Sequence, residues 1–393
     1  MSKYRARSGI WCFFLCVLVY AFTVYSGNEL RRYINIPHIV IPTLPIYIVL
    51  GVVGVFIMFI FVREHRIKVD VICALLAIRL LLHIIPVFYT NVSQNFMINY
   101  VTSGLCIIFF IIGRNFAFDS DFIERIINVI LLIICIQTIF ESFLGTQSYW
   151  GSTYFYKRDL TIPIGASNAI ASKIIPCYGL VMCNKSNKII RILNTNLVVL
   201  SLALTKSRSG IIAFLVILGI VLVWNGQLSI KNVLAITVVL TVIGVLFYRF
   251  ATKTLLGGFV FSESDSTILG RYESWENGLS IFSDHPIFGS GFSKDVITNN
   301  PHNYIIDILM RSGIVGIFLF ITIVIQFIKK IKNTTFDPFV RGCICFATCM
   351  LIQGLAEVVL FSYVTDMLLW FILGAMVCRA NTLKYGYQYN SSN

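Results

Sequence analysis

Long runs of apolar residues, separated by short polar segments, follow one another along the 393-residue chain. Most of these runs have about 17–25 residues, the length of a helix that crosses the hydrocarbon core of a bilayer. Backbone groups inside lipid need hydrogen-bond partners within their own segment, so each run is expected to be a helix. The pattern predicts about twelve membrane spans, near residues 9–27, 39–62, 69–89, 97–113, 122–144, 166–183, 190–205, 209–224, 231–248, 303–328, 340–360 and 362–378.

Composition supports the same fold class. Hydrophobic residues make up 57% of the chain and charged residues only 12%, which is too little charge to give a soluble protein of this length a polar surface. The eleven cysteines lie in or beside apolar runs and include no CxxC pair. We therefore interpret them as small buried hydrophobic residues. The chain is predicted to be an all-α, polytopic integral membrane protein with about 12 transmembrane helices.

The distribution of basic residues predicts the orientation of the chain. With a cytoplasmic N-terminus, 17 of the 31 Lys and Arg residues fall on cytoplasmic segments, 10 on outer segments and four inside spans. Basic loops favour the cytoplasm, so both termini are predicted to be cytoplasmic, and the first run is expected to be an uncleaved span. This distribution accounts for the net charge of +13 without nucleic acid as a partner. The predicted organisation is nine transmembrane helices in residues 1–248, a large outer loop at 249–302, and three transmembrane helices and a cytoplasmic tail in 303–393.

The outer loop contains a predicted surface helix at about residues 268–283. Apolar and aromatic residues recur there every three or four positions and share one face: Leu269, Tyr272, Trp275, Leu279 and Phe282. Such a helix is expected to lie on the membrane surface, although an amphipathic linker without chemistry would give the same pattern. The segment "SDHPIFGSGF" then makes a turn, in which His285 is expected to pack beside Pro286.

Several ionisable residues lie inside predicted spans, where charge is costly and marks candidate functional sites. Arg79 lies near the middle of the third span, one turn before His83, and Lys173 lies in the sixth. Five acidic and basic residues lie toward the outer ends of their spans: Glu141, Asp307, Arg311, Glu357 and Asp366. A polar cavity that opens outward would explain this arrangement. For one pair the alternative is mutual neutralisation, because Asp307 and Arg311 are four residues apart on one helix.

Two cations, Lys206 and Arg208, occupy a very short join between apolar runs on the predicted outer side. Held there, they could bind an anion, since Arg forms bidentate contacts with phosphate. Extension of their side chains to lipid head groups is the alternative. His285 and His302 have no third ligand at metal spacing, so no metal site is predicted.

Three segments in this order resemble the O-antigen polymerase and O-antigen ligase family of bacterial membrane glycosyltransferases. They are "TKSRSG" at 205–210, "GRYESWENGLSIFSDHPIFGSGF" at 270–292 and "PHNYIIDILMRSGIVG" at 301–316, and "IGASNAIA" at 164–171 is a looser match. The resemblance covers roughly the second half of the chain. It implies a GT-C-like membrane fold in which one long outward-facing loop carries short amphipathic helices.

The resemblance also implies a chemistry. The donor would be a glycan on undecaprenyl pyrophosphate at the outer face of the bacterial inner membrane, and transfer would need neither metal nor cofactor. Arg208 and Arg271 match the family's motif arginines and are expected to stabilise the pyrophosphate leaving group. His302 matches the family's His-Asn position and is expected to act as a base or to position substrate. The remaining expected substrate contacts are Lys206, Arg158, Arg79, Tyr272 and Trp275.

The leading functional prediction is a polymerase of undecaprenyl-pyrophosphate-linked oligosaccharide repeat units, for O-antigen or capsule. A ligase that transfers the glycan to lipid A-core is the alternative within the family. A transporter, such as a polysaccharide flippase, is the alternative from another class, because transporters bind substrate near the midplane, where Arg79 and Lys173 are predicted to lie. The long outer segment favours an enzyme. The expected partners are the lipid-linked glycan, membrane lipid and a regulator of chain length.

Overall fold

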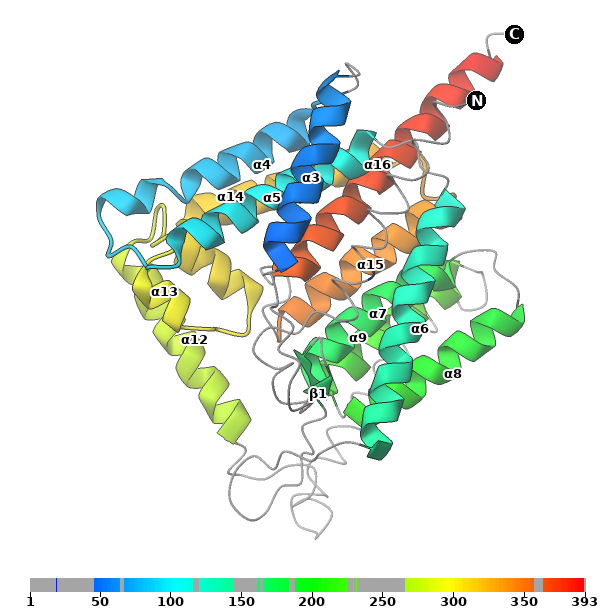
Figure 1. Cartoon of the computed structure of the whole chain (residues 1–393), viewed down its shortest axis with the longest axis horizontal. Coiled ribbons are helices and arrows are strands. Elements are labelled where there is room, and N and C mark those ends of the chain that lie inside the picture. The colour runs from blue at the N-terminus through cyan, green and yellow to red at the C-terminus, as the bar shows by residue number, and fades with distance from the viewer. Residues whose placement is uncertain are drawn as a thin grey trace, which may run out of the picture.

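The computed structural model describes residues 19, 46–63, 67–115, 120–144, 161–162, 165–183, 188–205, 207–224, 229, 231, 266–356 and 363–391. This part of the chain is helical apart from one small β-hairpin, which the sequence pattern did not predict (Figure 1). In chain order the elements are α3 (Ile46–Arg63), α4 (Val71–Leu82), the 3-10 helix η1 (Ile85–Phe88), α5 (Phe96–Asn115), α6 (Ser120–Leu144), β1 (Thr161–Ile162), β2 (Gly165–Ala166), α7 (Ser167–Met182), α8 (Lys188–Thr205), α9 (Arg208–Trp224), α12 (Ser266–Asp284), α13 (Lys294–Thr298), α14 (Tyr304–Ile331), α15 (Pro338–Gly354) and α16 (Tyr363–Ser391).

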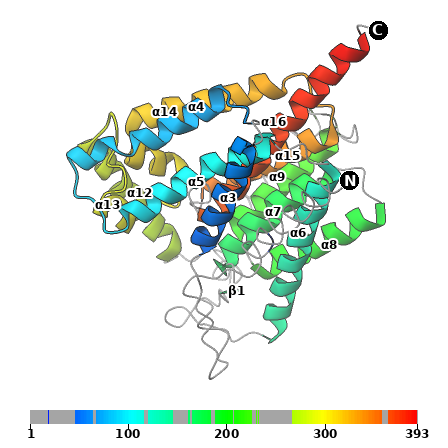
Figure 2. The same ribbon diagram turned by 45° about the horizontal axis from the view of Figure 1, so that its top comes forward.

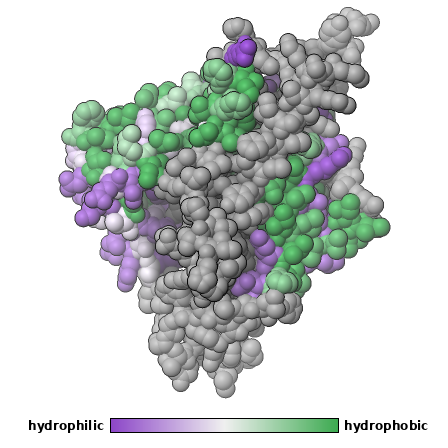
Figure 3. All heavy atoms as spheres, in the orientation of Figure 1, coloured by the Kyte–Doolittle hydropathy of each residue, from purple (hydrophilic) through white to green (hydrophobic). Residues whose placement is uncertain are grey.

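Five helical segments are long and apolar enough to cross a membrane: Val71–Phe88, Phe96–Asn115, Ser120–Ser142, Tyr304–Ile331 and Asp366–Lys384. Five shorter apolar helices accompany them: Gly51–Ile60, Asn168–Met182, Ile189–Thr205, Ser209–Trp224 and Pro338–Gly354. Together they match ten of the predicted spans. The spans predicted at 9–27 and 231–248 lie, apart from single positions, outside the described residues. Hydrophobic side chains cover α4, α6 and α8, whereas hydrophilic ones gather around α12 and α13 (Figure 3). The protein is therefore an integral membrane protein.

The helices form two packed groups, which α15 and α16 join (Figure 2). In the first group, α5 lies against α16 so closely that a Cβ on Gly113 would collide with the Phe371 carbonyl oxygen. In the second group α7 is central and contacts α6, α8, α9 and α15. A Cβ on Gly342 of α15 would come within 2.5 Å of the Leu180 carbonyl oxygen of α7. Small residues thus let helix backbones meet, as is common within membranes.

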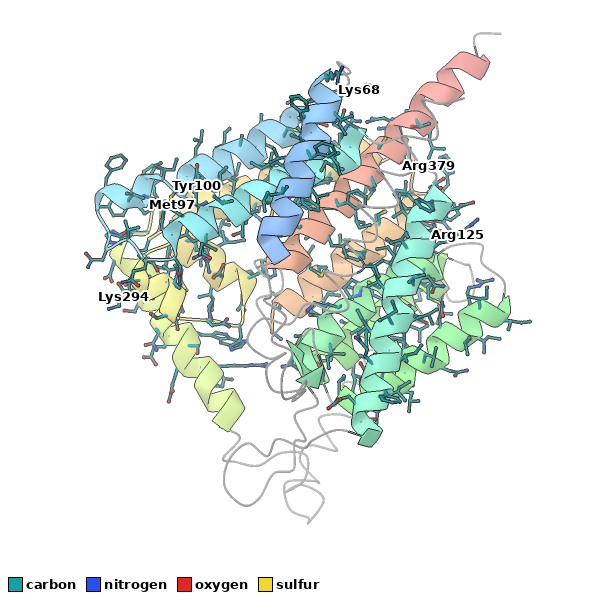
Figure 4. The ribbon with its side chains drawn as sticks, in the orientation of Figure 1. Lys68, Met97, Tyr100, Arg125, Lys294 and Arg379 are labelled. Atoms are coloured by element: carbon teal, nitrogen blue, oxygen red, sulfur yellow. The ribbon has the colours of Figure 1, made fainter. Side chains whose placement is uncertain are left out.

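Ion pairs tie the helices together at one end of the bundle. Asp70 caps the start of α4 and lies 3.5 Å from Arg114 of α5 and 3.4 Å from Lys330 of α14. Asp337 caps α15 and pairs with Arg379 of α16 at 2.8 Å. Figure 4 shows Lys68 and Arg379 at this end, with Met97 and Lys294 at the opposite end. Residues 70, 114, 330, 337 and 379 therefore mark one end of the bundle.

One predicted span is not a straight helix. Gly313 interrupts α14 with φ 60° and ψ −158°, which divides the helix into a first arm (304–312) and a second arm (314–331). The rings of Tyr304 and Phe320 lie 5.7 Å apart, although sixteen residues of straight helix would separate them by about 24 Å. The span predicted at 303–328 therefore corresponds to a helix that bends at Gly313, so that its two arms fold back toward each other.

Candidate functional site

The outer turn, residues 285–293, docks onto the bend of α14. Backbone groups that the bend removes from the helical hydrogen-bond pattern find partners in this turn. Four hydrogen bonds do this: Ser290 N to Met310 O (2.7 Å), Gly291 N to Arg311 O (3.0 Å), Ile314 N to Pro286 O (2.9 Å) and Val315 N to Ile287 O (3.2 Å). The bend and the turn therefore depend on each other.

Two glycines make this docking possible. Gly289 and Gly313 have φ values of 69° and 60°, which L-residues with a side chain rarely adopt. A Cβ on Gly289 would lie 2.5 Å from the Ser312 nitrogen, and one on Gly313 would collide with the Ile287 carbonyl oxygen. Gly289 of "FGSGF" and Gly313 of "RSGIVG" are thus explained by mutual contact between the two motifs.

The end of α4 holds the other side of the outer turn. The Tyr89 hydroxyl donates to the Gly289 carbonyl at 2.7 Å. The Tyr89 ring lies 4.7 Å from the ring of His285, which confirms that His285 packs within the turn. Six residues earlier, at the C-terminal cap of α4, His83 stacks on Phe292 with ring centroids 4.7 Å apart.

The predicted surface helix exists as α12, and it packs on the first arm of α14. A Cβ on Gly278 would lie 2.7 Å from Ile306, and Trp275 and Ile281 pack against a small buried cluster that contains Ile306. Tyr272, by contrast, is 60% exposed. The indole Nε1 of Trp275 is buried and has no hydrogen-bond acceptor among the described residues. A donor in this position is available to a bound ligand.

Arg271 and His302 flank one contact between α12 and the segment before α14. The Asn299 side-chain amide donates to the Ser274 carbonyl at 3.3 Å. Arg271 precedes Ser274 by three residues and is half-buried, and His302 follows Asn299 by three residues. Each of these two predicted site residues is therefore within three residues of this contact.

The backbone of His302 is unusual. Its φ of 48° makes it the one non-glycine residue with positive φ in the described part of the chain. The preceding Pro301 is buried, the His302 N–H donates to Asn300 Oδ1 at 3.1 Å, and Asn303 caps α14 by accepting from two backbone amides. A sparsely populated conformation that neighbouring residues enforce is typical of functional positions.

The segment "TKSRSG" contains a short connection between two helices, as predicted. Helix α8 ends at Thr205 and α9 begins at Arg208. Ser207 is fully buried, donates to Asn168 Oδ1 at 2.9 Å and accepts from the Gly210 amide at 3.2 Å. Asn168 belongs to "IGASNAIA", so two of the motifs are in contact. The side chain of Arg208, and Lys206 and Arg158 entirely, lie outside the described residues.

The C-terminal end of α15, at Gly354, lies between these two groups of motifs. Its Cys349 donates to the Ile175 carbonyl of the antiparallel α7 at 3.6 Å, while a Cβ on Gly354 would touch Tyr304 of α14 at 2.9 Å. Asn168 lies seven residues from Ile175 along α7, and Gly354 lies five residues from Cys349 along α15. These stretches of helix are about 8–11 Å long. The Asn168 and Tyr304 motifs therefore lie at a similar depth on two sides of α15.

A second polar cluster lies deeper, and it contains four of the predicted intramembrane charges, Arg79, Asp307, Arg311 and Asp366. Arg311 pairs with Asp307 at 2.7 Å, as predicted from their spacing. Asp366 of α16 accepts hydrogen bonds from Trp370 Nε1 at 2.9 Å and Cys106 Sγ at 3.1 Å, and it lines the same cavity as Arg79. No carboxylate lies near Arg79 in the sequence. In the structure, Asp366 of the distant helix α16 supplies one.

The comparisons with known proteins agree with this geometry. Residues 194–321 match the family model described as O-antigen ligase. This match, which covers about a third of the chain, supports the O-antigen ligase and polymerase family. The matched segment runs from α8 to the second arm of α14, and it includes Arg208, Arg271 and His302. Members of the family are membrane glycosyltransferase-like enzymes. A search of the curated proteins finds no match to the chain.

Proposed function

We propose that the protein polymerises lipid-linked oligosaccharide repeat units at the outer face of a bacterial inner membrane, with both of its termini in the cytoplasm. The family match supports a glycosyl transfer of this kind. The observation that carries the proposal is the convergence of the motifs at 164–171, 205–210, 270–292 and 301–316 around the outer end of α15. One end of the bundle thereby becomes a compact polar structure above apolar helices.

In the proposed reaction, an acceptor hydroxyl oxygen attacks the anomeric carbon of the donor sugar. The bond from that carbon to the lipid pyrophosphate breaks, and the pyrophosphate leaves with the electron pair. Arg208 and Arg271 stabilise the growing negative charge, which requires fixed cations close to the leaving oxygen. His302 takes the hydroxyl proton, a role that suits an imidazole near neutral pH. The transfer needs no metal ion in this scheme.

The remaining proposed contacts surround these groups. The buried Nε1 of Trp275 is free to donate to a sugar oxygen, and the exposed ring of Tyr272, 5.5 Å from the Trp275 ring, offers an apolar face to a sugar. Lys206 and Arg158 are proposed to contact phosphate or sugar. A regulator of chain length is a proposed partner on the same side of the membrane.

Transfer of the glycan to lipid A-core is the second candidate, because the matching family model is described as an O-antigen ligase. Both reactions use the same donor and the same leaving group. They differ in the acceptor, which is another lipid-linked unit for the polymerase and lipid A-core for the ligase.

The glycan profile of a strain that lacks the protein separates these functions. Lipid A-core capped with one repeat unit would support the polymerase, since export and ligation would then be intact. Bare lipid A-core with long chains retained on the lipid carrier would support the ligase. Bare core with single units trapped on the inner leaflet would contradict both and favour a flippase. Complementation with the unaltered gene is the control in each case.

A further inference from the structure

Two cysteine side chains meet between α7 and α15. The Sγ atoms of Cys183 and Cys345 lie 3.6 Å apart, although the two residues are 162 positions apart in the chain. Cys345 is fully buried in α15, and Cys183 is half-buried directly after the last residue of α7. A disulfide has its sulfurs about 2.05 Å apart, so a small side-chain rotation would bring these two thiols to bonding distance.

The packing of the two helices explains this contact. A Cβ on Gly179 would lie 3.1 Å from the Cys345 Cβ, so Cys345 faces this turn of α7. Cys183 follows Gly179 by four residues and therefore continues the same face. Each Cα–Cβ bond of a helix tilts toward the N-terminus of that helix. Because α15 runs antiparallel to α7, this tilt carries the Cys345 side chain toward the end of α7, where Cys183 lies.

Glycines on both helices keep the backbones close here. Gly179 faces α15, and a Cβ on Gly342 of α15 would come within 2.5 Å of the Leu180 carbonyl oxygen. The Cα atoms of disulfide-bonded cysteines are usually about 4.4–6.8 Å apart, and larger side chains at the two glycines would hold the helices further from each other. The same seam contains Cys349, but its thiol donates to the Ile175 carbonyl.

Cys183 is the more accessible of the two thiols. It lies at the end of α7, and Cys345 lies two turns after Asp337, which caps the start of α15 at the same end of the bundle. In the predicted orientation this end faces the cytoplasm. Disulfides in that compartment are usually transient and redox-sensing, since glutathione and thioredoxin keep thiols reduced.

We propose that Cys183 and Cys345 form a site of reversible oxidation, at which hydrogen peroxide converts the two thiols into an interhelical disulfide. This inference does not depend on the proposed function. The Cys183 thiolate attacks one peroxide oxygen, the O–O bond breaks, and hydroxide leaves and takes up the thiol proton as water. The Cys345 sulfur then attacks the sulfenic sulfur of Cys183, loses its own proton, and a second water leaves. A soluble dithiol reverses the bond by thiol–disulfide exchange.

The bond fastens two central elements of the fold to each other. Helix α7 is the centre of the second group of helices, and α15 joins that group to the first. The loop that the bond closes is long, and in the chain-entropy account a cross-link that closes a long loop restricts the unfolded chain most. Oxidation is therefore expected to raise the melting temperature of the protein.

Peptide mapping of the oxidised protein is the direct test. The full-length protein is purified under reducing conditions, freed of reductant, treated with hydrogen peroxide and blocked with N-ethylmaleimide before digestion and mass spectrometry. We expect one pair of peptides joined through Cys183 and Cys345, and a melting temperature higher by about 4 °C or more. Dithiothreitol should reverse both changes. Recovery of both cysteines as maleimide adducts would overturn the proposal, as would pairing spread over other cysteines.

Cys345→Ala and Cys349→Ala are matched variants, because both thiols are fully buried in α15 one turn apart. Cys349→Ala should still form the disulfide and gain stability on oxidation, whereas Cys345→Ala should do neither. Cys183→Ala is a second loss variant at a half-buried position, where truncation leaves less of a cavity. Equal responses of these three variants to peroxide would show that the contact between Cys183 and Cys345 is not the site of oxidation.

The same mapping in cells tests whether the site is reached there. Cells that produce the protein are exposed to hydrogen peroxide, quenched with acid and alkylated before digestion. The joined peptides should appear during the exposure and disappear after the peroxide is removed. If they form in the purified protein but not in cells, cellular oxidants do not reach Cys183, and the proposal of a modification site fails.

Discussion

The hydroxyl of Ser207 donates a 2.9 Å hydrogen bond to the side-chain oxygen of Asn168, 39 residues earlier in the chain. Ser207 also caps α9, because its oxygen accepts from the Gly210 amide. Ser207→Ala removes both interactions, so it should lower stability by about 1–2 kcal/mol. Arg208 is the first residue of the capped helix, so glycan transfer should fall by about tenfold or more. Thermal unfolding of the purified protein and the glycan profile of the complemented strain measure the two effects.

Ser283→Ala is the matched control for this substitution. Ser283 is exposed, and its hydroxyl bonds only the Ser280 carbonyl of its own helix. Its loss should change neither stability nor transfer measurably. If Ser207→Ala and Ser283→Ala behave alike, the contact between the two motifs does not position Arg208.

Gly313→Ala tests the bend of α14. A side chain at this position would be strained at φ 60° and would collide with the Ile287 carbonyl oxygen, so the outer turn would have to move. We expect a loss of stability of about 2–4 kcal/mol and loss of glycan transfer. Thermal unfolding and complementation provide the measurements.

Gly104→Ala serves as the control for the bend. A Cβ on Gly104 of α5 would meet only the Leu80 side chain, at an ordinary 3.6 Å. This variant should fold as well as the unaltered protein, since Ala is the better helix former. An active Gly313→Ala variant would show that the outer turn does not require this bend.

The bend also shows what the sequence could not predict. Helix positions follow from apolar runs, so the span predicted at 122–144 matches α6 at 120–144. A glycine inside an apolar run, however, is equally compatible with a straight helix. Helix α14 bends at Gly313, where four backbone groups on either side of this glycine bond to a turn that lies twenty or more residues earlier in the chain. Such a partner leaves no local periodic signal.

The same distinction between local and distant contacts applies to the candidate site. The pairing of Asp307 with Arg311 was predictable because residues four apart share one face of a helix. The placement of Asp366 in the cavity of Arg79 was not, since these residues lie on helices at opposite ends of the chain. The positive φ of His302 was not predicted either, and this residue lies beside local hydrogen bonds, from its N–H to Asn300 and from the α14 backbone to Asn303.

Arg208 and Arg271 are predicted to stabilise the leaving group. Arg208→Ala and Arg271→Ala should each reduce glycan transfer by about 100-fold or more, the range found when one stabilising donor is lost from an active site. Protein levels in the membrane should stay normal, as an immunoblot would show. Arg63→Ala is the control, because Arg63 lies at the exposed end of α3. Retained transfer in both site variants would refute the assignment of the pyrophosphate to these arginines.

The proposed reaction uses arginines in place of a divalent cation. Treatment of the purified protein with EDTA, followed by assay with lipid-linked repeat units, should therefore leave the rate of transfer unchanged. Adding Mg²⁺ back should have no effect either. A chelator-sensitive rate that Mg²⁺ or Mn²⁺ restores would show that a metal ion neutralises the pyrophosphate, as it does in many other phosphate sites.

His302 combines a special backbone with a side chain suited to proton transfer, and two substitutions separate these properties. His302→Asn keeps a residue that tolerates positive φ, and His302→Gly removes the backbone strain, but neither supplies a base. If the imidazole takes the proton, both variants should fold normally and lose transfer by about 100-fold or more. If His302 acts only through its backbone, both variants should stay active, whereas His302→Val, which is poorly compatible with φ 48°, should not. His285→Ala provides the contrast, since it removes a ring that packs against Tyr89 and should lower the melting temperature more than the rate per folded molecule.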